Sequence, residues 1–162
     1  MRKYFYLLFA VVLACVYVAC SNDEESIETS LISIQNKGVE VQNNDVLQFD
    51  AAENFFGEMV AGHETEPTFI AKSPCKIEVT ITLPDNNLDY FKWCGFTDEC
   101  SVYCEPGAYT RIVEQLVSKA GMAVHASFKS GEFASCLVRV DVKVNGKAER
   151  TFFLQYNYSD NK

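Results

Sequence analysis

The sequence contains few of the groups from which common enzyme sites are built. It has only two histidines, His63 and His125, and one tryptophan among 162 residues. It also lacks a GxSxG nucleophile turn, an HExxH zinc motif, a P-loop and a glycine fingerprint for dinucleotides. These absences argue against the enzyme and nucleotide-binding classes that depend on such motifs.

Positively charged residues are also scarce. There are 14 Lys and Arg residues against 22 Asp and Glu residues, which gives a net charge of −8. Removal of residues 1–19 as a signal peptide would take away Arg2 and Lys3 and no anion, so 12 cations and a net charge of −10 would remain. A chain this acidic repels phosphate backbones and anionic headgroups. We therefore expect no nucleic-acid partner and no membrane contact through a basic face.

The longest apolar run lies near the N-terminus, from Tyr4 to Val18. It is shorter than the roughly 20 residues that a spanning helix needs. Two cations precede it, and the small residue Ala19 follows it, directly before Cys20. A cationic start, a short apolar run and a small residue at the cleavage site are typical of a secretory signal.

The end of this segment, Tyr17-Val18-Ala19-Cys20, resembles the lipobox of bacterial lipoproteins. The resemblance implies that Cys20 is acylated, as with palmitate, and becomes the first residue of the mature chain. Lipoboxes usually carry Leu, Val or Ile where this chain has Tyr17, and Val12-Leu13-Ala14-Cys15 matches more closely by letter. Processing there would leave an apolar stub, whereas Cys20 opens directly into polar chain, so we expect lipidation at Cys20.

The residues after Cys20 carry information about destination. Ser21 is not the aspartate that marks retention in the inner membrane, which favours the outer membrane. The run Ser21-Asn22-Asp23-Glu24-Glu25 resembles the acidic export signal of surface-exposed lipoproteins of Bacteroidota. The resemblance implies a lipid-anchored protein that faces the cell surface, with the periplasmic face as the alternative. Such a charge run also suits a solvated tether.

The rest of the chain predicts one domain. We expect a signal peptide at 1–19, an acidic tether at 20–30, a single β-rich domain at 31–158 and a tail at 159–162. A mature chain of this length is long enough to bury a core. Alternating or short apolar runs predict strands at 31–34, 39–41, 46–49, 76–83, 88–93, 122–128, 133–144 and 148–158. We expect the 88–93 strand to pair with the 76–83 strand.

One segment, residues 110–120, has the apolar spacing of a helix. Its apolar residues form one stripe, and polar residues lie opposite; the stripe consists of Ile112, Val113, Leu116, Val117 and Ala120. Thr110 can cap the start of this helix and Gly121 its end. The predicted fold is therefore α+β, mainly antiparallel β with one helix packed on a sheet, and a two-sheet sandwich is one possible arrangement.

Two registers compete for the last hairpin. A two-residue turn at Asn145-Gly146 would place polar side chains opposite the valines of the first strand. A three-residue loop with a bulge pairs Val140 with Phe152 and Val144 with Ala148 instead. We favour the bulged hairpin, because register decides which face of a strand is buried.

Five cysteines remain after the expected processing: Cys75, Cys94, Cys100, Cys104 and Cys136. Disulfides are the default outside the cytoplasm. Cys75 and Cys136 share the inward parity of their strands, where they either form a bridge or remain buried thiols. Cys94, Cys100 and Cys104 lie in one irregular segment, and we expect at least one bridge among them. Their spacing matches neither a CxxC pair nor a zinc knuckle, so we expect no metal and no cofactor.

Aromatic residues gather around these cysteines: Tyr90, Trp93, Phe96, Tyr103 and Tyr109. They form either an exposed binding patch or part of the core. Asp85, Asn87 and Asp89 have the spacing that opens a calcium loop, but Tyr90 stands where that loop needs glycine, so a plain turn is favoured.

Two functional hypotheses follow. The first is a lipid-anchored surface or envelope lipoprotein that is not an enzyme and binds a glycan, a protein or an assembly partner. The second is a small extracytoplasmic enzyme that uses a cysteine of the 94–104 segment, activated by His63 or His125. A disulfide in this segment would favour the first hypothesis.

Overall fold

The computed structural model describes residues 30–53, 59–61, 67–84, 88–96, 99–128 and 135–157. The expected signal peptide, Cys20, the tether up to residue 29 and the tail at 159–162 lie outside the described residues. His63, Asp85 and Asn87 lie outside them as well.

Twelve β-strands and no helix make up the described part of the chain. The strands are β1 (Ile32–Asn36), β2 (Val39–Glu40), β3 (Val46–Glu53), β4 (Met59–Ala61), β5 (Thr68–Ala71), β6 (Cys75–Leu83), β7 (Leu88–Gly95), β8 (Ser101–Tyr103), β9 (Gly107–Leu116), β10 (Lys119–Phe128), β11 (Cys136–Val144) and β12 (Lys147–Asn157). Among these residues, no helix is long and apolar enough to cross a membrane.

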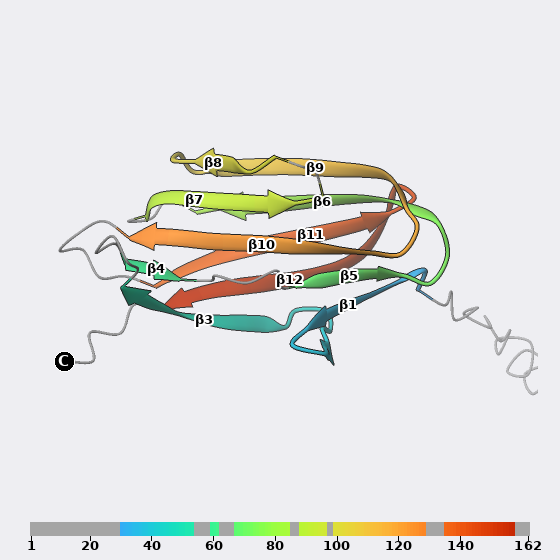
Figure 1. Ribbon diagram of the computed structural model, residues 1–162, viewed down its shortest axis with the longest axis horizontal. Coiled ribbons are helices and arrows are strands. Elements are labelled where there is room, and N and C mark those ends of the chain that lie inside the picture. The colour runs from blue at the N-terminus through green and yellow to red at the C-terminus, as the bar shows by residue number, and fades with distance from the viewer. Residues whose placement is uncertain are drawn as a thin grey trace, which may run out of the picture.

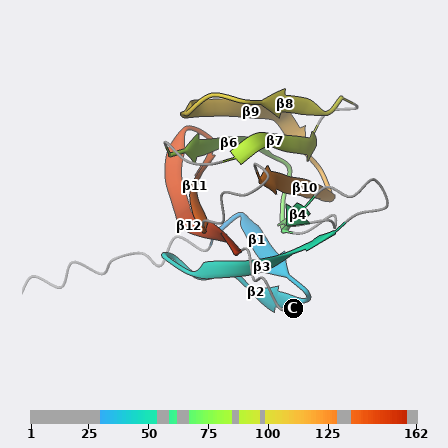
Figure 2. The same ribbon diagram turned by 90° about the vertical axis from the view of Figure 1, so that its left-hand side faces the viewer.

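The strands form two sheets packed face to face, so the fold is a β-sandwich (Figures 1 and 2). The back sheet has the order β3-β12-β11-β6-β9, and the front sheet has the order β2-β1-β5-β10-β7-β8, with β4 beside the other end of β10. β3 belongs to both sheets, because residues 46–50 pair in parallel with β12 and residues 51–53 pair with β4. β7 pairs with β10 and β8, so its expected pairing with the 76–83 strand is wrong.

The core lies between the two sheets. Strict alternation along β6 buries every second residue, from Cys75 to Leu83, while the residues between them face outward. The largest fully buried side chains are Trp93, Tyr156, Phe69, Phe91 and Phe152. Removal of these apolar surfaces from water is the main stabilising term of the fold.

The helix predicted at 110–120 is wrong, because these residues belong to β9, a short turn and the start of β10. A β-bulge explains the misleading spacing. Val113 pairs with Ile77 and Leu116 pairs with Cys75, so β9 contains one residue more than β6 between the two pairs. Val113 and Leu116 therefore both face the core although they are three residues apart, which is also the spacing of neighbours on a helix face.

The last hairpin has the predicted register along its strands but a different loop. Val140 pairs with Phe152, as expected for the bulged hairpin, but Val144 pairs with Lys147, so its predicted pairing with Ala148 is wrong. The extra residue is Glu149 in β12 and not a third loop residue. Asn145 and Gly146 form a two-residue turn with φ values of 49° and 81°, which is typical of type I′.

Tyr156 lies at the centre of an aromatic group in the core. Its ring stacks on Phe49, with ring centroids 5.3 Å apart, and meets Phe91 edge-on at 5.9 Å. Its buried hydroxyl has no hydrogen-bond partner among the described residues. Burial raises the pKa of Tyr156 well above its usual value, because an apolar environment disfavours the phenolate.

We expect Tyr156→Phe to leave the free energy of unfolding unchanged or to raise it by about 1 kcal/mol, since an unpaired buried hydroxyl is destabilising. The matched control is Tyr109→Phe, which removes a hydroxyl that donates to Glu105 O at 2.8 Å and should lower stability by up to about 1 kcal/mol. Urea denaturation measures both variants. A loss larger than that of the control would show that the Tyr156 hydroxyl is hydrogen-bonded.

Candidate functional site

The five aromatic residues proposed as a binding patch do not form one exposed surface. Trp93 points into the sandwich and is fully buried. Phe96 is half-buried and meets Trp93 edge-on, with centroids 6.2 Å apart. Tyr103 and Tyr109 stack on each other at 3.9 Å where β8 lies beside β9 (Figure 1). Tyr90 lies apart from these four, on the outer side of the front sheet. The other four pack along the margin of the sandwich where β8 lies beside β9.

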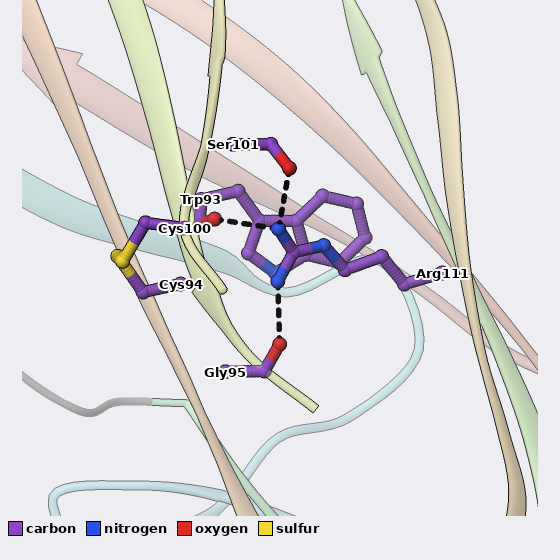
Figure 3. Close-up of a disulfide and its surroundings, with 6 residues drawn as sticks. All are labelled: Trp93, Cys94, Gly95, Cys100, Ser101 and Arg111. Atoms are coloured by element: carbon purple, nitrogen blue, oxygen red, sulfur yellow. Dashed lines mark hydrogen bonds between the residues drawn. A yellow bond between two sulfur atoms is a disulfide. The ribbon is translucent and has the colours of Figure 1, made fainter. Parts of the chain in front are cut away.

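Arg111 of β9 holds this margin together from the inside (Figure 3). Its side chain is buried and its guanidinium lies over the Trp93 ring, 4.7 Å from the centroid. Nη1 donates to Gly95 O at 2.6 Å, and Nη2 donates to Trp93 O at 2.9 Å and to Ser101 Oγ at 2.8 Å. Because Arg111 comes from the back sheet and its acceptors come from β7 and β8, these contacts join the two sheets.

A disulfide in the predicted segment fixes the acceptors of Arg111. It joins Cys94 at the end of β7 to Cys100 just before β8 (Figure 3). Gly95 follows Cys94 with φ of 101°, and a Cβ at this position would lie 2.1 Å from Gly121 O on β10. Only glycine fits such a close approach of two backbones. The cysteine segment is therefore a structural staple at the margin.

The three remaining cysteines among the described residues are free thiols. Cys75 and Cys136 are buried and Cys104 is exposed, so the structure supports the buried-thiol interpretation for the inward pair. Burial raises the pKa of Cys75, and it raises that of Cys136 to about 11. Thiols with a raised pKa are poor nucleophiles near neutral pH. In the described part of the chain, no three His, Cys, Asp or Glu side chains lie close enough to hold a metal ion.

The outer face of the back sheet carries a series of polar contacts between neighbouring strands, which the sequence alone did not predict. Ion pairs join Lys143 to Glu78 at 2.8 Å and Lys76 to Glu114 at 2.9 Å. The hydroxyls of Thr80 and Thr110 lie 2.8 Å apart in a hydrogen bond. The alternation of Arg139, Asp141 and Lys143 along β11 was the available signal, but only the pairing of strands shows which groups meet.

A hollow of about 540 Å³ opens on this outer face. Its polar lining consists of Asn43, Thr80, Asp141, Lys143, Glu149, Arg150 and Thr151. One side is formed by the bulge at Glu149, and the other by the turn that leads into β3. This turn is fixed to β12, because Asn43 Oδ1 accepts from Thr151 N at 2.9 Å and Asn44 N donates to Thr151 O at 2.7 Å. Bulges often re-aim side chains next to functional sites.

Asp141 is the most strongly held group in the hollow. Arg139 donates to both of its carboxylate oxygens at 2.8 Å, and Thr151 Oγ1 donates to Oδ1 at 2.6 Å. The hydrogen bond from Arg139, together with that from Thr151 and the nearby Lys143, holds the pKa of Asp141 below its usual value despite partial burial. The carboxylate is therefore ionised at neutral pH and acts as a fixed hydrogen-bond acceptor.

A second charged pair connects this region to the front sheet. Arg150 Nη1 donates to Glu40 Oε1 at 2.8 Å and also to Val41 O. Burial alone would raise the pKa of Glu40, but hydrogen bonds from Ser33 and Arg150 lower it below its usual value. Ser30, the first described residue, donates to Glu149, so the chain enters the domain beside the hollow.

Comparison with known proteins identifies the fold and no family. No protein-family model matches the chain, and no curated protein matches it. The structure is similar to that of the N-terminal domain of PorA, with a TM-score of 0.56 and 13% identity over 81% of this chain and 99% of that one. It is more distantly similar to CfaE, the adhesive subunit of the CFA/I fimbria of enterotoxigenic Escherichia coli (TM-score 0.42, 7% identity, 82% of this chain and 49% of that one). The second likeness is too weak to support a statement about this chain.

The margin contacts predict that Arg111 cannot be replaced by another cation. We expect Arg111→Lys to lower the free energy of unfolding by about 2 kcal/mol, because an ammonium cannot reach three separated acceptors and leaves buried carbonyls unpaired. The matched control is Arg139→Lys, an exposed pair whose loss should cost less than about 1 kcal/mol. Urea denaturation measures both, and equal losses would contradict the role of Arg111.

The acid side of the stability curve should depend on Asp141. Its folded-state pKa lies below the unfolded value of about 4, so its contribution is present above that pH and is lost as the pH falls through the folded pKa. We expect the difference in free energy of unfolding between the wild type and Asp141→Asn to be constant near neutral pH and to shrink below about pH 4. Denaturation across this pH range measures it; a difference independent of pH would contradict the prediction.

Proposed function

We propose that this protein is a lipid-anchored lipoprotein of the outer membrane that faces the cell surface, and that its sandwich domain binds a ligand without catalysing a reaction. The sequence Tyr17-Val18-Ala19-Cys20, followed at once by the acidic run 21–25, carries this proposal. Acylation of Cys20 anchors the chain, because each buried methylene of an acyl chain contributes about 0.8 kcal/mol and two or more chains hold firmly.

The disulfide between Cys94 and Cys100 supports an extracytoplasmic location. Disulfides persist in oxidising compartments and are rare in the cytosol. The margin of this sandwich is built around the bridge, since the residues on either side of Cys94 in β7, Trp93 and Gly95, supply the carbonyls that Arg111 binds. A protein with this requirement is suited to the envelope or the cell surface.

The disulfide within the cysteine segment favours binding over catalysis. The competing hypothesis needs a reactive thiol at Cys94, Cys100 or Cys104, and the bridge removes two of the three from nucleophilic chemistry. His125 lies on β10 opposite Lys92 of β7, on the outer side of the front sheet. The hollow on the back sheet, by contrast, offers a set of fixed donors and acceptors, which is what a binding site requires.

Lipidation is tested by expressing Cys20→Ala and Cys15→Ala in a bacterium that processes lipoproteins. We expect Cys20→Ala to abolish labelling with a palmitate analogue and to release the protein from the membrane fraction, because the acylated residue is gone. Cys15→Ala should behave like the wild type. The opposite result would show that the mature chain starts at Cys15. Absence of the label from both variants would contradict the lipid anchor. Protease treatment of intact cells then distinguishes the outer face from the periplasmic face.

A further inference from the structure

We propose that the hollow on the outer face of the back sheet is a binding site for a short, neutral saccharide. The inference rests on the proposed function, because it names the class of ligand for the binding module. The hollow has a volume of about 540 Å³, which falls within the range of roughly 300–1,000 Å³ that is typical of small-molecule binding sites.

The charges of the hollow favour a neutral ligand. Its four ionisable lining residues are two acids, Asp141 and Glu149, and two bases, Lys143 and Arg150. Three of them already have a partner of opposite charge. Asp141 pairs with Arg139. Lys143 pairs with Glu78, and Arg150 pairs with Glu40. A bound cation or anion would have to compete with these pairs, at the cost of leaving one group unpaired. A hydroxyl group can bind beside them without breaking any pair.

The remaining hydrogen-bond capacity suits a sugar. Asn43 uses its carbonyl oxygen on Thr151 N, which leaves its amide hydrogens as donors. Asp141 accepts three hydrogen bonds from Arg139 and Thr151, and an ionised carboxylate has about four acceptor positions. Lys143 gives one of its three donors to Glu78. Donors and acceptors therefore lie within one hollow, and sugar hydroxyls, which both donate and accept, match such a mixed set.

An apolar surface lies directly beside these groups. Phe153 is the next outward residue after Thr151 on β12, and it is half-buried. It pairs with Arg139 of β11 on one side and with the exposed Val46 of β3 on the other. A pyranose ring has C–H groups on its faces and hydroxyls around its rim, so one ring of a short saccharide can cover Phe153 while its hydroxyls point toward Asp141, the diagonal neighbour of Phe153 on β11. Binding sites commonly combine apolar surface with a few fixed polar groups in this way.

The experiment uses the full chain, purified with its disulfide intact in a detergent that has no sugar headgroup. Isothermal titration and ¹⁵N NMR are run with maltotriose, mannotriose and chitotriose, and with sialyllactose and a heparin disaccharide as charged probes. We expect at least one neutral trisaccharide to bind at millimolar or lower concentration and to shift the amide signals of Asn43, Asp141 and Thr151. Binding of only the charged probes, or shifts confined to other residues, would overturn the inference.

Two variants locate the site, and one serves as a control. Thr80→Val removes a hydroxyl that lines the hollow and should weaken binding about 3- to 10-fold, and Asp141→Asn should weaken it about tenfold or more. Thr110→Val breaks the same Thr80–Thr110 hydrogen bond without changing the lining and should leave the affinity within about twofold. NMR spectra of the free variants confirm folding. Equal losses for Thr80→Val and Thr110→Val, or none for Asp141→Asn, would overturn the site.

The outcome separates this inference from the proposed function. A lipidated, surface-exposed protein that ignores all three neutral sugars would overturn the inference and leave the anchoring proposal intact. A chain that carries no acyl group but binds maltotriose, mannotriose or chitotriose through Asp141 would support the inference and contradict the anchoring.

Discussion

The fold depends on holding two sheets together along the margin where β8 and β9 lie side by side. At the opposite margin the backbone does this, because β3 hydrogen-bonds in both sheets. Among the described strands none crosses at the β8–β9 margin, and Arg111 makes the connection through Trp93, Gly95 and Ser101. A buried guanidinium is tolerated only when its donors are used, so the end of β7, which supplies the carbonyls of Trp93 and Gly95, has to keep its shape. The disulfide and the glycine beside it meet that requirement.

Arg111 also lies on an edge strand of the back sheet. β9 pairs with β6 on one side, and its other side is the end of the sheet. An edge strand with free backbone groups can recruit a strand from another chain, and a charged side chain that points inward is one way to discourage this. Arg111 is such a side chain.

Alternation in the sequence predicted most strands and, beyond the bulge, the register of the last hairpin, because period-two patterns are local. It failed at 110–120, where a bulge in β9 gave Val113 and Leu116 the spacing of a helix. It could not predict that β3 pairs in parallel with β12, more than a hundred residues away, since nothing local encodes that contact. The burial of Trp93 could have been predicted from the sequence, because Phe91 and Trp93 alternate with Lys92 along β7. Proximity to the cysteines suggested a patch, but proximity in sequence does not distinguish the two faces of a strand.

The hollow was hidden from the sequence for the same reason as the pairing of β3, because its lining comes from the turn at 43–44, from β6 and from both strands of the last hairpin. The ion pairs of Asp141 and Lys143 are largely exposed to solvent and contribute little to stability, whereas the partly buried pair of Arg150 with Glu40 joins the hollow to the front sheet. The interior and the Arg111 margin stabilise the sandwich, and the outer face of the back sheet is thereby free to carry recognition chemistry. Ser30 contacts Glu149 at the rim of the hollow, so the chain that leads back to Cys20 enters beside it. A ligand bound there would lie next to Ser30, the first described residue of the domain after the expected tether.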